Sequence, residues 1–265
     1  MNVEQATVLK NERLTPAHYR MTLACHPSYQ EAVPGQFVML HVSGRDAPLL
    51  PRPFSIHRFL GLPGGEAAVQ VLYRVVGPGT RKMARTREGE RVQMVGPLGR
   101  GFMLAGAGSR PMVVAGGMGV APMVFLVEAM LEKGMDPKDC RVFLGARGRE
   151  ELLCRDELID AGVMLQVTTD DGSDGEHCPV THPFQTAARA DSPERIYACG
   201  PEAMLRCVAQ AARVLKTPCQ VSIETLMACG IGACLGCAVK GKPQDSYLHV
   251  CSEGPVFDTE LLGWS

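Results

Sequence analysis

The chain has 265 residues, of which 46% are hydrophobic and 21% are charged, as in an ordinary globular protein long enough to bury a substantial core. The formal net charge is −1 and the basic residues are spread along the chain, which argues against a nucleic-acid or membrane-surface partner. No apolar run reaches the ~18 residues that span a bilayer, and the first residues lack the pattern of a signal peptide, so we expect a cytoplasmic location.

Short apolar or alternating runs fill the first hundred residues. They cover 36–42, 68–76 and 90–99, and the turn signals LPGG at 62–65 and GPGT at 77–80 separate them. Many short strands punctuated by Gly and Pro predict a small antiparallel barrel or sandwich. One short helix is expected near Thr80–Arg87, directly after the glycines of the second turn.

Two stretches of this region carry groups suited to a phosphate or a flavin. In RPFSIH (52–57), Arg52 offers a cation to a phosphate, and Ser55 offers a hydroxyl to a phosphate or to the edge of a flavin ring. In GPGT, the amides before a helix can face a pyrophosphate. A plain strand edge and a plain turn would look the same, so these residues alone leave the ligand open.

The stretch PMVVAGGMGVAPMVFLVEAMLEKG (111–134) predicts a strand, a glycine turn and a helix. The strand covers Met112–Ala115, and the helix runs from about Val120 to Lys133, with Gly134 as its C-terminal cap. Such a unit binds a phosphate or a nicotinamide-bearing ligand at the start of the helix. The spacing is not G-x-G-x-x-G, so a tight turn without a ligand stays open as the alternative. The turn glycines are Gly116, Gly117 and Gly119.

Strand and helix signals then alternate from 140 to 216, which predicts a parallel sheet with crossover helices. YACGPEAML repeats the strand–turn–helix pattern and places Cys199, Gly200 and Pro201 at the carboxyl end of a strand, where open α/β sheets bind ligands. Cys199 is equally a candidate for a small buried side chain. Arg147 and Arg149 are candidates for holding a 2′-phosphate, so the choice between NAD and NADP stays open.

Near the end of the chain, MACGIGACLGC is followed 14 residues after its last cysteine by another cysteine. The spacing C-x4-C-x2-C with a distant fourth Cys is that of plant-type [2Fe–2S] sites. The interspersed glycines permit the sharp turns that let a short loop deliver three thiolates to one small volume. Zinc is the rival, but zinc sites usually have two close cysteine pairs, and here only one C-x2-C pair is present. Chance clustering of cysteines is the third possibility.

RPFSI, GPGT, GGMGVAP, YACGPEAML and the cysteine block with VCSEGPVFD together resemble the flavin reductase superfamily that includes ferredoxin–NADP reductase. More closely, the chain resembles the electron-transfer subunits of NAD-dependent (class 1B) dihydroorotate dehydrogenase. The likeness covers nearly the whole chain in the right order, and the C-terminal block is its most specific part. It implies an α+β multidomain protein with an FAD-binding antiparallel β-barrel (1–103), an NAD-binding α/β domain with a parallel sheet (104–216) and a small [2Fe–2S] domain (217–265).

The resemblance also implies three groups of binding residues and no conventional catalytic acid or base. Those expected to line the FAD are Arg52, Pro53, Phe54, Ser55, Leu72, Tyr73, Arg74, Gly79 and Thr80. Those expected to frame the nicotinamide of NAD(H) are Gly116, Gly117, Gly119, Cys199, Gly200 and Pro201. Those expected to hold the [2Fe–2S] cluster are Cys229, Cys234, Cys237 and Cys251.

Finally, the resemblance implies a partner: an FMN-containing dihydroorotate dehydrogenase catalytic subunit of pyrimidine biosynthesis, in a heterotetramer with two copies of each chain. Electrons would pass through the [2Fe–2S] cluster and FAD to NAD⁺. Two alternatives stay open: a reductase subunit of a sulfhydrogenase or ferredoxin:NADP transhydrogenase type, and a zinc-stabilised binding module without redox activity. Met227, Ala233 and Leu235 offer apolar surface either to a partner or to the core.

Overall fold

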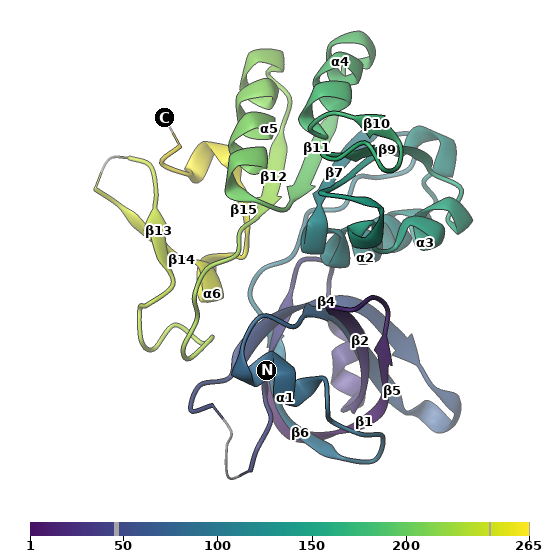
Figure 1. Ribbon diagram of the computed structural model, residues 1–265. Helices are drawn as coiled ribbons and strands as arrows, with labels where there is room; N and C mark the ends of the chain where they lie inside the picture. Colours follow the sequence, from purple (N-terminus) through teal and green to yellow (C-terminus); the bar gives the residue numbers. More distant parts are fainter. Residues whose placement is uncertain (45–47, 244, 265) are drawn as a thin grey trace.

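The computed structural model describes residues 1–44, 48–243 and 245–264. A closed barrel forms one half of the molecule, and a sheet flanked by helices forms the other half (Figure 1). In the described part of the chain, no helix is both long enough and apolar enough to cross a membrane. The expected fold class of an antiparallel barrel, a parallel-sheet domain and a small C-terminal region is confirmed.

Six antiparallel strands close the barrel in the order β1-β2-β5-β4-β3-β6. The burial of β6 alternates along its length, as the inward and outward faces of a barrel wall require. The sequence analysis had no prediction for β1 and β2, the first two strands of the barrel. The six strands are β1 (Asn2–Arg13), β2 (His18–Cys25), β3 (Phe37–His41), β4 (Arg52–Gly61), β5 (Ala67–Arg74) and β6 (Arg91–Leu98).

The short helix of the barrel domain, α1 (Pro78–Met83), begins earlier and ends earlier than the expected Thr80–Arg87. Pro78 opens it, where a missing N–H costs nothing. It ends early because the side-chain amide of Asn11, on β1, donates to the carbonyls of Met83 (2.8 Å) and Thr86 (3.0 Å). A long-range contact therefore satisfies the Met83 carbonyl, which a helix continued to Arg87 would have paired internally, and the Thr86 carbonyl, which such a helix would have left unpaired.

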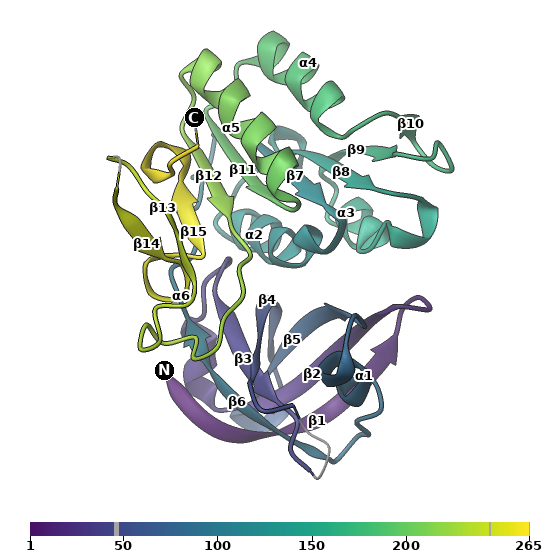
Figure 2. The ribbon, with the colours of Figure 1, turned by 60° about the vertical axis from the view of Figure 1, so that its left-hand side comes forward.

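The second half is a seven-stranded sheet in the order β10-β9-β8-β7-β11-β12-β15, parallel except for the last pair. Figure 2 shows α2 and α3 on one face and α4 and α5 on the other, so the central strands are buried on both sides. The sequence analysis had no prediction for α4. The strands are β7 (Pro111–Gly116), β8 (Arg141–Ala146), β9 (Met164–Thr169), β10 (Glu176–His177), β11 (Arg195–Cys199), β12 (Cys219–Ser222) and β15 (Val256–Asp258); the helices are α2 (Val120–Glu132), α3 (Arg155–Asp160), α4 (Thr181–Asp191) and α5 (Glu202–Leu215).

The cysteine-rich segment lies between β12 and β15. It leaves the sheet after β12, forms the hairpin β13 (Ala238–Lys240) and β14 (Tyr247–His249), continues into α6 (Val250–Glu253) and returns as β15 beside β12. Both ends of the cysteine-rich segment are therefore fixed to the seven-stranded sheet. Six short 3-10 turns complete the structure: η1 (Pro27–Glu31), η2 (Pro63–Gly65), η3 (Gly117–Gly119), η4 (Pro137–Asp139), η5 (Arg149–Glu151) and η6 (Thr259–Leu261).

Candidate functional site

A cavity of about 210 Å³ opens between β4, β5 and the segment that follows β12. The antiparallel pairing of β4 with β5 brings two predicted flavin segments to the same wall. The ring of Tyr73 stacks on Tyr19 with 5.5 Å between centroids and meets Phe54 edge-on at 6.0 Å, so this wall is aromatic and rigid. Six of the predicted flavin residues line the cavity: Pro53, Phe54, Ser55, Leu72, Tyr73 and Arg74.

The other three predicted flavin residues lie together at the start of α1. The guanidinium of Arg52 covers Gly79 so closely that a Cβ at position 79 would be 2.5 Å from Arg52 Nε. The hydroxyl of Thr80 accepts the N–H groups of Val76 (2.9 Å) and Gly77 (3.1 Å). Thr80 therefore holds the turn itself, and the guanidinium of Arg52 lies over this turn.

A groove of about 980 Å³ runs along the carboxyl ends of the parallel strands. Five of the six predicted nicotinamide residues line it: Gly116, Gly117, Gly119, Gly200 and Pro201. Close packing demands glycine here, because a Cβ on Gly119 would be 2.2 Å from the carbonyl oxygen of Cys199. The Cys199 side chain itself is buried and is not part of the groove lining, and burial raises the pKa of its thiol.

The flavin-type cavity and the groove meet at one junction. Arg74, Met118, Ile223, Glu224 and Thr225 line both spaces. Glu224 opens into this junction, where partial removal of water by the surrounding protein raises the pKa of its carboxyl. The sequence analysis missed Glu224. The feature that could have identified Glu224 is its position two residues after β12, at the same sheet edge as the two glycine turns.

The four cysteines of the predicted cluster site lie at the other end of the same segment and just beyond it. Because Ala238 pairs with His249 in the β13–β14 hairpin, Cys237 and Cys251 are brought side by side, with their Sγ atoms 3.3 Å apart. Both are buried, whereas Cys229 is half-buried and Cys234 is exposed. All eleven cysteines are free thiols.

Backbone N–H groups point at these sulfurs. The amides of Ile231 (3.5 Å) and Cys234 (3.4 Å) donate to Cys229 Sγ, and the amide of Gly232 donates to Cys251 Sγ at 3.1 Å. Burial alone would raise the pKa of Cys229, but these amides outweigh it and lower the pKa to about 6. Burial and the neighbouring Cys237 raise the pKa of Cys251 to about 11. Four thiols with amide donors around them fit the ligand set and the hydrogen bonding of a [2Fe–2S] cluster.

The cysteine loop also touches the barrel. Gly230 packs so closely on β3 that a Cβ there would be 2.5 Å from Met39 Cγ. Met227, two residues before the first cysteine of the loop, lines the flavin-type cavity. Of the three apolar residues considered for a partner surface, Ala233 and Leu235 are exposed and Met227 forms part of the cavity wall.

Comparisons with known proteins identify the family. A family model described as the iron–sulfur cluster binding domain of dihydroorotate dehydrogenase B matches residues 224–263, and one described as the oxidoreductase NAD-binding domain matches residues 113–210. A protein of Desulforamulus reducens named dihydroorotate dehydrogenase B (NAD(+)), electron transfer subunit, is 38% identical over 264 residues, which cover 99% of this chain and 98% of that protein. The chain belongs to this family of electron transfer subunits.

Further relatives agree with this family of electron transfer subunits. A protein of the same name from Caldanaerobacter subterraneus subsp. tengcongensis is 33% identical, over 97% of this chain and 96% of that protein. The solved structure of an NADH-dependent reduced ferredoxin–NADP oxidoreductase superposes with a TM-score of 0.83 at 25% identity, covering 98% of this chain and 90% of that one. A ferredoxin NADP⁺ reductase from Neisseria gonorrhoeae with bound FAD and NADP shares the fold, with a TM-score of 0.66 at 16% identity over 81% and 92%. The resemblance stated from the motifs is thereby confirmed.

Proposed function

We propose that this chain is the electron transfer subunit of an NAD⁺-dependent dihydroorotate dehydrogenase, which takes electrons from a catalytic subunit and delivers them to NAD⁺. Near-full-length relatives carry that name, and the two matched family models fit iron–sulfur and NAD binding. The observation that carries the proposal is the path of residues 223–229. This short segment borders the nucleotide groove at Glu224, lines the flavin-type cavity at Met227 and reaches the first loop cysteine at Cys229.

The residues fit the three groups in that order. The aromatic wall of β4 and β5 with Arg52 suits FAD, the glycine-lined groove suits NAD(H), and the four thiols with their amide donors suit a [2Fe–2S] cluster. When bound, a [2Fe–2S] cluster supplies transfer of single electrons, and a flavin supplies transfer of single electrons or of a hydride. We assign no catalytic acid or base, because hydride transfer between flavin and nicotinamide needs none from the protein.

The chain's own contribution is to bind, to orient and to exclude water. Met118 and Ile223 give the meeting point of cavity and groove an apolar lining, which Phe54 and Tyr73 continue into the cavity. Arg74 places a cation there, held by an ion pair with Glu151 of the sheet domain at 3.3 Å. Water excluded from such a junction cannot compete for the reacting atoms.

The name electron transfer subunit implies a catalytic partner, and we propose that this partner carries FMN and that two copies of each chain assemble. The cysteine loop presents exposed apolar side chains for such a contact: Leu226 is 91% exposed, Ile231 50% and Leu235 58%. Exposed apolar side chains gathered beside a redox site suit a protein–protein interface.

Anaerobic purification from the native source tests the proposal. We expect flavin and iron–sulfur absorption bands together, and co-purification with an FMN-containing subunit that oxidises dihydroorotate. Co-purification with a hydrogenase or a ferredoxin-type partner instead would favour another reductase complex. A colourless protein that contains zinc would end the redox assignment.

A further inference from the structure

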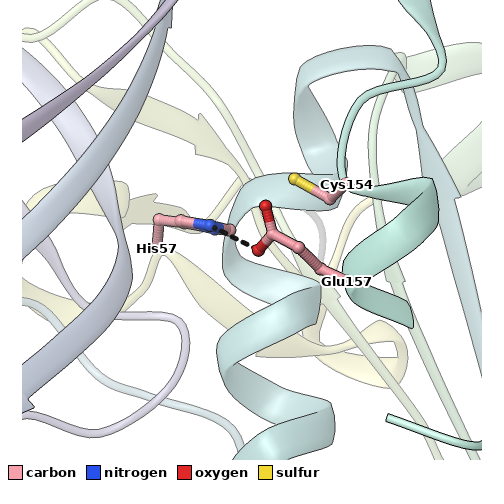
Figure 3. A group of neighbouring side chains, drawn as sticks. All are labelled: His57, Cys154 and Glu157. Carbon is pink, nitrogen blue, oxygen red and sulfur yellow. Dashed lines mark ion pairs between the residues drawn. The ribbon is translucent and has the colours of Figure 1, made fainter. Parts of the chain in front are cut away.

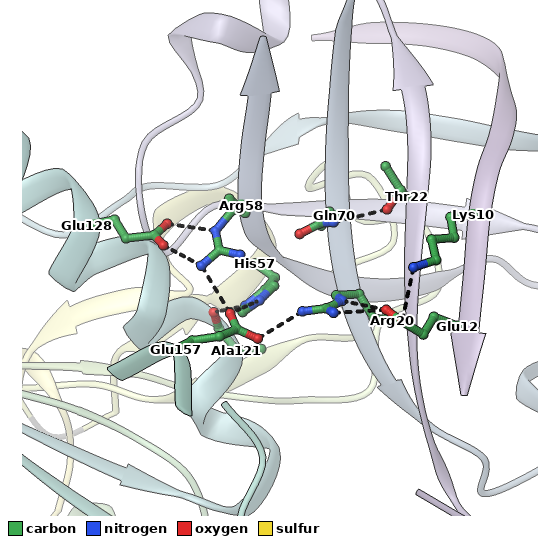
Figure 4. A network of polar contacts seen from close by, with 10 residues as sticks. All are labelled: Lys10, Glu12, Arg20, Thr22, His57, Arg58, Gln70, Ala121, Glu128 and Glu157. Atoms are coloured by element: carbon green, nitrogen blue, oxygen red, sulfur yellow. Dashed lines mark hydrogen bonds and ion pairs between the residues drawn. The ribbon is translucent and has the colours of Figure 1, made fainter. Parts of the chain in front are cut away.

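A single buried ring connects the strand of the flavin-type cavity to the helix of the nucleotide groove. β4 carries the cavity residues 53–55 and then His57, and α2 begins directly after the glycine turn at Gly119. His57 Nδ1 is 2.9 Å from the backbone carbonyl oxygen of Ala121, in the first turn of α2. The ring is 0% exposed. His57 lies two residues after Ser55, and its partner Ala121 lies two residues after Gly119 (Figure 4).

The opposite edge of the same ring faces α3. His57 Nε2 is 3.2 Å from Glu157 Oε2 (Figure 3). A carbonyl oxygen only accepts hydrogen bonds, so Nδ1 is the donor in its contact with Ala121. Nε2 and Glu157 Oε2 form no hydrogen bond, so their contact is a close approach of the ring to the carboxylate. His57 therefore bonds α2 through one edge of its ring and faces α3 with the other.

Glu157 is itself fixed from the barrel side. Its carboxylate contacts Arg20 Nη1 of β2 at 2.8 Å and Arg58 Nη2 of β4 at 3.0 Å, and Arg58 Nε also donates to Glu128 of α2 at 2.9 Å (Figure 4). Burial by itself raises the pKa of Glu157, but the contact with His57 and the charges of Arg58 and Arg20 outweigh it and lower the pKa to about 2. The carboxylate is therefore charged across the physiological range.

Cys154 adds a third group of the kind that binds metals. Its Sγ atom, a ring nitrogen of His57 and a carboxylate oxygen of Glu157 all lie within 4.8 Å of one another (Figure 3). A metal would need the thiolate, but burial raises the pKa of Cys154, and two guanidiniums already neutralise the carboxylate. The surroundings therefore do not favour a metal ion at this place.

We propose that His57 and Glu157 are positioning residues: their contacts with each other and with Ala121, Arg20 and Arg58 fix the strand that holds the flavin against the helix that holds the nicotinamide. The inference rests on the proposed function, because it concerns hydride transfer between those two groups. Such transfer needs the reacting atoms about 3–3.5 Å apart, and a misplacement of roughly 1 Å costs on the order of a hundredfold in rate. The binding residues of each cofactor lie elsewhere on either half, so binding should survive when the pair is lost.

The test compares His57→Gln, Glu157→Gln and the double variant with wild type as cofactor-loaded protein. Stopped-flow mixing with NADH gives the maximal rate of flavin reduction and the dissociation constant separately. We expect the rate to fall about tenfold to hundredfold, with weaker charge-transfer absorption of stacked nicotinamide and flavin, while the FAD content and the dissociation constant for NADH stay close to wild type. The double variant should be no slower than the slower single variant, because both changes break the same junction between the two halves.

Asp191→Asn is the matched control. It removes a carboxylate from an exposed ion pair with Arg141 (2.6 Å) inside the sheet domain, and its rate should equal that of wild type. Bound zinc in wild type that disappears in Cys154→Ser would overturn the inference.

The kinetic outcomes separate this inference from the function on which it rests. Unchanged rates in all variants, with a wild type that NADH reduces, overturn the positioning role and leave the function intact. A wild type whose flavin does not react with NADH overturns both. Variants that lose FAD or fail to fold would show that the pair maintains the structure rather than the reaction geometry, which also overturns the proposal.

Discussion

The nucleotide groove and the cysteine loop are binding regions of opposite construction. The groove lies at the ends of hydrogen-bonded strands, and all six residues of β7 are buried. Residues 223–237 of the loop region, all within the described chain, form no helix or strand. A Cβ on Gly119 would collide with the carbonyl of Cys199 at 2.2 Å, whereas a Cβ on Gly232 would meet nothing closer than 3.6 Å.

The two glycines are therefore required for different reasons. Gly119 is fixed by packing, because its neighbours are backbone atoms that cannot move aside. Gly232 is fixed by conformation, because its φ of +83° lies in the left-handed region that other residues avoid. Packing therefore limits which residues the nucleotide groove accepts. Backbone conformation and the need for sulfur ligands limit which residues the cysteine loop accepts. Changes to the two regions should consequently fail in different ways.

The largest effect is expected from Cys234→Ser. A hydroxyl is a poor substitute for a thiolate in an iron–sulfur site, and Cys234 is exposed, so its replacement leaves the packed core untouched. Electron flow to the partner should be abolished, with lower iron and acid-labile sulfide, while FAD and NADH oxidation by an artificial acceptor persist. Cys178→Ser, outside the loop, is the control. Equal loss of both activities would contradict the separation of the two regions.

Gly119→Ala should disturb the tightly packed nucleotide groove. Overpacking against backbone costs about 1–3 kcal/mol, and the displaced turn should raise the KM for NADH. Urea unfolding and steady-state kinetics measure both effects. Gly106→Ala is the matched control, because no atom lies within 4 Å of a Cβ at that position. Similar behaviour of the two variants would show that packing does not dictate glycine at position 119.

Glu157→Gln tests whether the fold can be destabilised at α3 without affecting the cysteine loop. The native pKa of Glu157 lies below its ordinary value of 4.5, so its charge stabilises the fold above pH 4.5 and this stabilisation is lost as the pH falls towards about 2. At pH 7 we expect a loss on the order of 2 kcal/mol in unfolding free energy, shrinking in acid, with iron content unchanged. A deficit that is equal at pH 7 and pH 3 would contradict the charge-based explanation.

Gly232→Ala should have the smallest effect. The left-handed conformation costs an alanine about 1 kcal/mol, with no steric clash to add. We expect faster loss of iron under chelation and almost no change in Tm, because only the loop is strained. A fall in Tm comparable to that of Gly119→Ala would show that the loop is part of the cooperative core.

Local patterns predicted the regular parts of the structure. The glycine turn at 116–119 and the helix after it were visible because an apolar strand, three glycines and an early proline follow one another directly. The helix α1 was misplaced because its end depends on Asn11, about 70 positions earlier in the chain. β1 and β2 were missed because outward-facing charged residues dilute their apolar pattern.

The binding residues show the same limit. The cysteine spacing predicted four thiols as cluster ligands, but it could not predict the hairpin that brings Cys237 beside Cys251. Cys199 was predicted at the correct end of its strand. Successive side chains of a strand point to opposite faces of the sheet, however, and the Cys199 side chain is buried rather than exposed to the groove. Glu224 could be recognised only after β12 was placed next to β11 in the sheet.

The cysteine-rich segment that carries the four thiols begins at β12 and ends at β15, so its anchors are part of the sheet domain, whereas the flavin wall belongs to the barrel. Electron tunnelling weakens steeply with separation. A hinge movement that tilts the barrel against the sheet would therefore change the distance between the thiols and the flavin wall. The angle between the two halves would then control the rate of single-electron transfer.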